Sequence, residues 1–129
     1  MAVVRSFTAL SVVAPAGDRI CSGAKTLEVR TWAPDTLPLC DLLIVQNQHR
    51  LSSAGPTEDP DGIVIAMVDV VAVREWRSDE VGAACASCWE PGWLAWELHN
   101  VRPIISPAKV AARLRLYEVT ISPPPHASR

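Results

Sequence analysis

The 129-residue sequence predicts a mostly β (α+β) fold: a small β-barrel of five to six strands with one or two short helices. Most apolar segments are short and rich in β-branched residues, and several alternate with polar residues at a period of two, as strands with one buried face do. Short polar turns join them, and one segment between the first two strands is punctuated like a helix. A parallel fold of alternating βαβ units is therefore disfavoured.

The first half of the chain predicts three strands and one helix. The helix is indicated by Pro15 near its start and Gly23 at its end, because proline suits the first helical turn and glycine suits the position after the last. In the strand that follows, Glu28 and Arg30 are two residues apart and point the same way. The expected elements are a strand over 8–13, a helix over 14–23, and strands over 26–32 and 41–46.

The second half predicts three more strands. A nearly continuous run of Val, Ile, Ala and Met over 62–73 is typical of a core strand that is covered on both faces. Before it, residues 51–62 are rich in proline, glycine, serine and acids, which indicates a surface loop. A short helix is expected over 79–87, and the last two strands over 93–102 and 113–121.

Length and composition indicate one domain over residues 1–121 and a disordered C-terminal tail over residues 122–129, since a chain of this size supports one hydrophobic core. The longest apolar run is broken by Asp69 and is shorter than the roughly 20 residues of a membrane span. The first residues lack the layout of a signal peptide. We therefore expect a cytoplasmic protein with no membrane partner, while its oligomeric state stays open.

Four cysteines, Cys21, Cys40, Cys85 and Cys88, are expected to be free thiols, because nothing indicates secretion. Cys85 and Cys88 have the spacing of half a zinc site or of a redox motif. No second Cys/His pair with ligand spacing follows them, so small packing residues are the simpler interpretation. The sequence predicts no metal and no cofactor.

The formal net charge of −2 hides an uneven distribution. Residues 1–32 and 101–129 together carry nine of the twelve Lys and Arg but three of the fourteen Asp and Glu, and the middle of the chain is acidic. If the two ends lie together in the fold, they form a basic face suited to a phosphate backbone. Ordinary solvated charges on a mildly acidic protein are the alternative, and composition does not decide between them.

A short motif joins the predicted helix to the next strand, with the spacing GxKxxExR over residues 23–30. Glycine ends a helix at little conformational cost, which places Lys25 at the mouth of the strand as a mobile charge beside an open cleft. Glu28 and Arg30 can restrain one another and leave guanidinium donors for a phosphate or a base edge. An ion pair that only closes the barrel is the alternative for these two residues.

The motif resembles the signature of the ASCH domain family, within the PUA-like group, and its place between the first helix and the second strand matches as well. Three further segments fit the same family in order: residues 10–12 before the helix, the glycine-led strand over 62–69, and residues 92–98 leading into 101–104. Together they span about residues 8 to 119.

ASCH domains resemble RNA-binding PUA-like modules. The resemblance therefore implies an RNA- or nucleotide-binding module with a cleft centred on the motif, and single-stranded RNA or a nucleotide-like small molecule as its partner. Trp32 is on the same strand face and could stack a base, although five tryptophans must also supply most of the core's aromatic volume. The candidate binding residues are Lys25, Glu28, Arg30, Trp32, Gln46, Asn47 and Gln48.

The alternative is a small metal-independent hydrolase, because branches of the ASCH family hydrolyse acetylated cytidine or cleave RNA. In that hypothesis Lys25, Thr26 and Glu28 are catalytic: Lys25 activates water or Thr26, and Glu28 or Glu97 moves a proton. The acetylcytidine branch carries its threonine three residues after the lysine, where this chain has Glu28. The arginine, glutamine and tryptophan that many relatives carry around Pro15 are also absent. An adaptor that binds only proteins is a third hypothesis.

Overall fold

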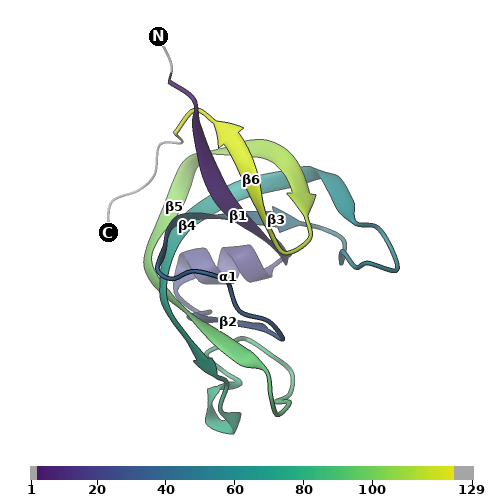
Figure 1. Cartoon of the computed structure of the whole chain (residues 1–129), viewed down its shortest axis with the longest axis vertical. Coiled ribbons are helices and arrows are strands. Elements are labelled where there is room, and N and C mark those ends of the chain that lie inside the picture. Colours follow the sequence, from purple (N-terminus) through teal and green to yellow (C-terminus); the bar gives the residue numbers. More distant parts are fainter. Residues whose placement is uncertain (1–2, 124–129) are drawn as a thin grey trace.

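The computed structural model describes residues 3–123, and this part of the chain forms one curved six-stranded sheet with a helix in its hollow (Figure 1). The mostly β fold with few helices is thus confirmed. The strands are β1 (Arg5–Val13), β2 (Leu27–Arg30), β3 (Leu39–Asn47), β4 (Glu58–Glu75), β5 (Leu94–Arg113) and β6 (Leu116–Ile121), the helix is α1 (Ala16–Ser22), and a 3-10 turn, η1, covers Ser78–Glu80.

The strand order in the sheet is β2-β5-β4-β3-β1-β6, and β1 pairs with β3 in parallel while the other pairs are antiparallel. In the described residues β2 and β6 lie at opposite ends of the sheet and are not hydrogen-bonded to each other, so the predicted barrel is not closed. β2 has only four residues, and at its start the backbone N–H groups of Thr26 and Leu27 donate to the carbonyl of Ala83. A loop therefore covers this edge instead of another strand.

The three largest differences from the sequence prediction concern β4, β5 and the helix expected over 79–87. β4 already begins at Glu58, inside the predicted loop, and β5 continues past residue 102 to Arg113. These two extensions pair with each other, Glu58 opposite Arg113, so tertiary pairing overrides the weak local propensity of a polar segment. The helix predicted over 79–87 is reduced to η1 and a series of turns. Residues 122 and 123 have no regular structure, and the remainder of the predicted tail lies outside the described residues.

The hydrophobic core lies where α1 packs into the hollow of the sheet. Ile20 of α1 contacts a cluster that includes Leu10, Val68 and the fully buried Trp96. The predicted core strand over 62–73 is confirmed, because its residues supply buried side chains to both main clusters of the core. A Cβ on Gly17 would collide with the side chain of Ile65, so glycine permits this close approach of helix and sheet. Within residues 3–123, no helix is long and apolar enough to cross a membrane.

Candidate functional site

The end of α1 directs the chain into the motif, as the sequence predicts. Gly23 has a φ of 85°, and its N–H donates to the carbonyl of Ile20 at 3.1 Å. Such a left-handed conformation favours glycine. The N–H of Lys25 then returns to the carbonyl of Arg19 at 3.0 Å. The turn after the helix therefore fixes the backbone at the start of β2.

Lys25 is not the mobile charge that the sequence predicts. Only 7% of the residue is exposed, and its Nζ donates to the carbonyl of Ala84 at 2.7 Å and lies 3.1 Å from Oε1 of Glu28. A buried ammonium group requires such acceptors, because it has lost its hydration. The loop that contains Ala84 supplies one of them. Ala84 is 59 residues from Lys25 in the chain, so the residues around Lys25 do not predict this contact.

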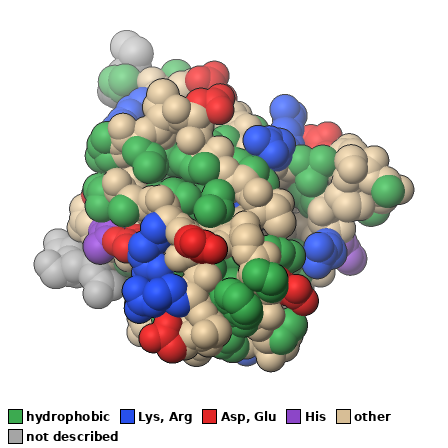
Figure 2. All heavy atoms as spheres, turned by 60° about the horizontal axis from the view of Figure 1, so that its bottom comes forward, with side chains coloured by type: hydrophobic (Ala, Val, Ile, Leu, Met, Phe, Trp, Pro, Cys, Tyr) green, Lys and Arg blue, Asp and Glu red, His purple; other side chains and the backbone are tan. Residues whose placement is uncertain are grey.

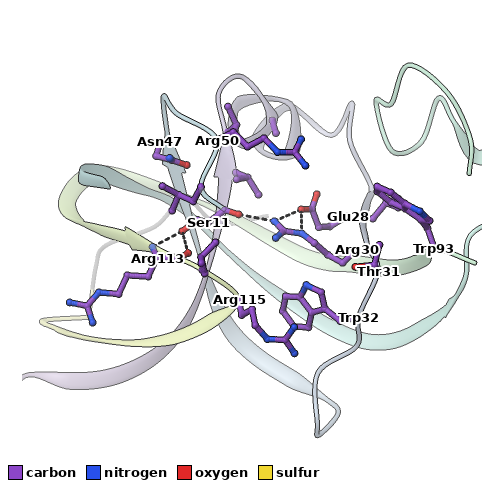
Figure 3. Close-up of a pocket in the computed structure, with 16 residues that line it drawn as sticks. Ser11, Glu28, Arg30, Thr31, Trp32, Asn47, Arg50, Trp93, Arg113 and Arg115 are labelled. Atoms are coloured by element: carbon purple, nitrogen blue, oxygen red, sulfur yellow. Dashed lines mark hydrogen bonds and ion pairs between the residues drawn. The ribbon is translucent and has the colours of Figure 1, made fainter. Parts of the chain in front are cut away.

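Glu28 joins two cations on opposite sides of its carboxylate. Its Oε2 accepts a hydrogen bond from Nε of Arg30 at 2.7 Å and forms an ion pair with Nη2 of the same residue at 2.6 Å (Figure 3). Nη2 of Arg30 also donates to the carbonyl of Ser11 on β1 at 2.7 Å. The prediction that Glu28 and Arg30 restrain one another is confirmed. Through this chain of contacts the motif ties β2 to β1 and to the loop at Ala84.

Arg30 borders the larger of two pockets beside β2, with a volume of about 560 Å³, within the usual range for small-molecule sites. β2, the ends of β1 and β3, and the turn between β5 and β6 enclose it. Of the described residues, four arginines line it, and Glu28 is the one carboxylate among the lining residues. The lining consists of Ser11, Val12, Val13, Ala16, Glu28, Val29, Arg30, Thr31, Trp32, Asn47, Arg50, Leu51, Trp93, Arg113, Leu114 and Arg115.

The arginines of this pocket differ in how they are held. The guanidinium of Arg115 lies over the ring of Trp32, 4.1 Å from its centroid, and Trp32 meets Trp96 edge to face at 5.0 Å. Arg113 points away from Arg30 in Figure 3 and pairs with Glu58 at 3.4 Å. Among residues 3–123, Arg50 and Arg115 have no carboxylate partner. The pocket therefore carries more positive charge than Glu28 neutralises.

A second pocket of about 340 Å³ lies on the other side of Glu28 and shares Glu28, Val29 and Trp93 with the first. Lys25 borders this smaller pocket, which is also lined by Trp76, Ala84, Cys85, Ala86, Ser87, Cys88 and Glu90. All four cysteines are free thiols, and Sγ of Cys85 donates to the carbonyl of Ala24 at 3.4 Å. Over the described part of the chain, no three His, Cys, Asp or Glu side chains are placed to hold a metal ion.

The structure separates the polar residues that the sequence groups together. Asn47 is fully buried at the larger pocket, where its amide nitrogen donates to the carbonyl of His49. Gln46 instead binds the first turn of α1, since its Oε1 accepts from the N–H of Asp18 at 3.1 Å. Gln48 and Thr26 are exposed and line neither pocket.

Of the predicted site residues, the larger pocket thus brings together Glu28, Arg30, Trp32 and Asn47, while Lys25 borders the smaller pocket beside Glu28. Sequence reasoning did not include Ser11, Arg50, Arg113 and Arg115 among the site residues. Arg113 and Arg115 belong to the basic C-terminal segment, and Arg50 ends the polar run that begins at Gln46, so these two sequence features indicated them.

Glu97, the other proposed proton carrier, lines neither pocket and belongs to a separate network. Its Oε2 accepts from Nε of Arg74 at 2.8 Å, and its Oε1 lies 3.2 Å from Nε2 of His99. Hydrogen bonds from Arg74, and then from His99, lower the pKa of Glu97. Arg74 also holds both oxygens of Glu80 at 2.7 Å. This geometry keeps Glu97 charged and in contact with other side chains.

This network predicts an acid-sensitive contribution to stability. Hydrogen bonds from Arg74 lower the pKa of Glu80 from 4.5 to about 2. A lowered pKa in the folded state gives stability that is complete above the ordinary value and is lost as the pH falls toward about 2. We expect Glu80→Gln to cost about 1–2 kcal/mol at neutral pH, after allowance for solvent screening, and to flatten the fall of the melting temperature below pH 4.5. An equally steep fall in the variant would contradict the assignment.

The two basic ends of the chain do come together, because β1 and β6 pair along their length. They do not form a uniform basic face, since Arg5 and Arg102 pair with Asp41 and Arg102 also pairs with Asp69. On the face shown in Figure 2, Lys and Arg side chains are interspersed with acidic and hydrophobic ones. Two arginines that have no carboxylate partner among residues 3–123, Arg50 and Arg115, instead line the larger pocket.

Comparisons with known proteins identify the family. The ASCH domain model matches residues 10–108, so the chain belongs to the ASCH domain family. A search of curated proteins found no match. Among solved structures, the chain is similar to a mutant of the ZmASCH protein from Zymomonas mobilis, with 18% sequence identity over 86% of this chain and 91% of that chain, and a TM-score of 0.49.

Proposed function

We propose that this ASCH domain, ending near residue 121, binds single-stranded RNA or a nucleotide-like small molecule in the larger pocket. The observation that carries the proposal is the group of arginines around one cavity of about 560 Å³ whose lining includes a single carboxylate. Guanidinium groups bind phosphate oxygens in a bidentate manner and remain charged at any physiological pH. The pocket therefore offers phosphate-binding groups beside aromatic rings, the combination that single-stranded nucleic acids require.

The arginines, rather than Lys25, make the phosphate contacts in this proposal. Nζ of Lys25 already contacts the carbonyl of Ala84 and the carboxylate of Glu28, so Lys25 holds the motif in place. Arg50 and Arg115 have no carboxylate to compete with a ligand within residues 3–123. Arg115 is also positioned by the ring of Trp32, so little side-chain freedom is lost when it binds.

A salt-dependent RNA titration tests the proposal. Fluorescein-labelled single-stranded RNA of mixed sequence is titrated with the protein at several salt concentrations, and the RNA is then examined for cleavage on a gel. If three arginines contact phosphates, log K is expected to fall by about 2 for each tenfold increase in salt. No binding, or binding indifferent to salt, would contradict the proposal.

A metal-independent hydrolase is the second candidate, and the observation that favours it is the buried pair of Lys25 and Glu28 beside the smaller pocket. Both groups are within reach of a ligand there, whereas Thr26 lines neither pocket. Water would therefore be the nucleophile. Cleavage of the RNA, or release of acetate from N4-acetylcytidine, that is lost in Lys25→Met would support this candidate. Absence of both reactions at high enzyme concentration would exclude these two versions of it.

A further inference from the structure

The free edge of β2 presents an unused pair of backbone hydrogen-bonding groups at Val29. Within residues 3–123, β2 is an end strand of the sheet and pairs only with β5, with Glu28 opposite Trp96 and Val29 opposite Ala95. The N–H of Leu98 donates to the carbonyl of Thr26 at 3.0 Å, which fixes the phase of the ladder. In an antiparallel pair the bonded residues alternate, so Glu28 bonds to β5 and Val29 directs its N–H and C=O away from β5.

These two groups belong to a residue that lines both pockets. The side chain of Val29 packs against the cluster of Leu27, Trp76, Ala84 and Ala95, yet Val29 also lines both pockets. Val29 is therefore a residue that both pockets share. In the described residues, the outward N–H of Leu27 donates to the carbonyl of Ala83, whereas no backbone group of the chain reaches Val29 in this way.

Trp93 supplies an aromatic ring to both of the pockets that Val29 lines. It is the one tryptophan that lines both pockets, and 37% of it is exposed. Trp32, in contrast, already has Arg115 over its ring, and Trp96 is fully buried. Trp93 therefore has more room for a stacked planar group than the tryptophan that the sequence favours.

From this juxtaposition we propose that the N–H and C=O of Val29 recognise the hydrogen-bonding edge of a nucleobase whose face lies on Trp93. The N–H and C=O of a strand edge bind an acceptor and a donor that are adjacent on one edge of the ligand. Each of the common bases carries such a pair of atoms. The inference rests on the proposed function, because the arginines of the larger pocket hold the phosphate of the same nucleotide. It adds that an unpaired base, rather than phosphate alone, is recognised.

A comparison of normal and abasic RNA tests the inference. Two labelled pentamers with the same phosphates are used, one of mixed sequence and one built of abasic riboses. Val29→Pro removes the N–H, and proline is tolerated on an end strand where the N–H is not part of the ladder. We expect Val29→Pro to weaken binding of the mixed pentamer about three- to tenfold and to leave the abasic pentamer unchanged.

The outcomes separate this inference from the proposed function. If both pentamers bind and Val29→Pro weakens neither, or weakens both equally, base recognition at Val29 is wrong while phosphate binding stands. If neither pentamer binds the wild type, both proposals fail. Should Val29→Pro not fold, wild-type protein labelled with [15N]valine decides: the amide signal of Val29 must shift with the mixed pentamer, and not with the abasic one, while that of the exposed Val71 serves as the reference. An unmoved Val29 signal overturns the inference.

Discussion

Glu28→Ala is expected to lower the free energy of unfolding by about 3 kcal/mol or more, because it leaves two buried or half-buried cations without their shared counter-ion. The side chain of Lys25 is 8% exposed and that of Arg30 is 24% exposed. Removing one partner of a buried ion pair lowers the free energy of unfolding by more than the intact pair contributes, because the remaining charges stay desolvated. Urea unfolding measures the loss: the urea concentration at the midpoint should fall, while the slope of the free energy of unfolding against urea concentration stays unchanged.

Two further variants show whether the effect arises from this carboxylate. Glu118→Ala removes an exposed acid of β6 that has no ion pair among residues 3–123, and we expect a change within about 0.5 kcal/mol. Glu28→Gln keeps the shape of the side chain and removes the charge, so it should lie between the wild type and Glu28→Ala. If Glu28→Ala were as stable as Glu118→Ala, the bridge between Lys25 and Arg30 would have no structural role.

The local features of the motif were predictable because each depends on residues a few positions apart. The end of α1 at Gly23 follows from the conformational freedom of glycine, and the contact of Glu28 with Arg30 follows from the alternation of side chains along a strand. The family resemblance depends on features of the same kind, because the motif and the three further segments that fit the family are each contiguous in the chain. Features that depend on residues a few positions apart can therefore be predicted from the sequence alone.

The composition of the pockets was not predictable, because it depends on pairings between distant segments. Arg115 reaches Trp32 only because β6 returns beside β1, and Lys25 is buried only because the loop at Ala84 lies over it. Composition and periodicity give no register for such contacts. The sequence therefore predicted Lys25 as a mobile charge, whereas the structure buries it and hydrogen-bonds it to the carbonyl of Ala84.

Arg50→Ala combined with Arg115→Ala is expected to weaken binding of single-stranded RNA about 25-fold at 0.1 M salt, because each phosphate contact that is lost removes about 0.7 from the slope of log K against log salt. The slope should become shallower by about 1.4, and the difference in affinity should vanish as the salt approaches about 1 M. Both side chains line the larger pocket and neither has a carboxylate partner in the described residues. The fold is expected to tolerate the change. Fluorescence polarisation across a salt series measures both quantities.

Arg19→Ala combined with Arg77→Ala is the matched control, since it removes the same number of charges from residues that line neither pocket. If long-range attraction to the whole molecule were responsible for binding, both double variants would lose affinity alike. If the larger pocket holds the phosphates, only the Arg50 and Arg115 pair changes the salt slope. An equal slope in the two double variants would therefore place the RNA elsewhere on the surface, and an unchanged affinity in both would leave the arginines of the pocket without a role in binding.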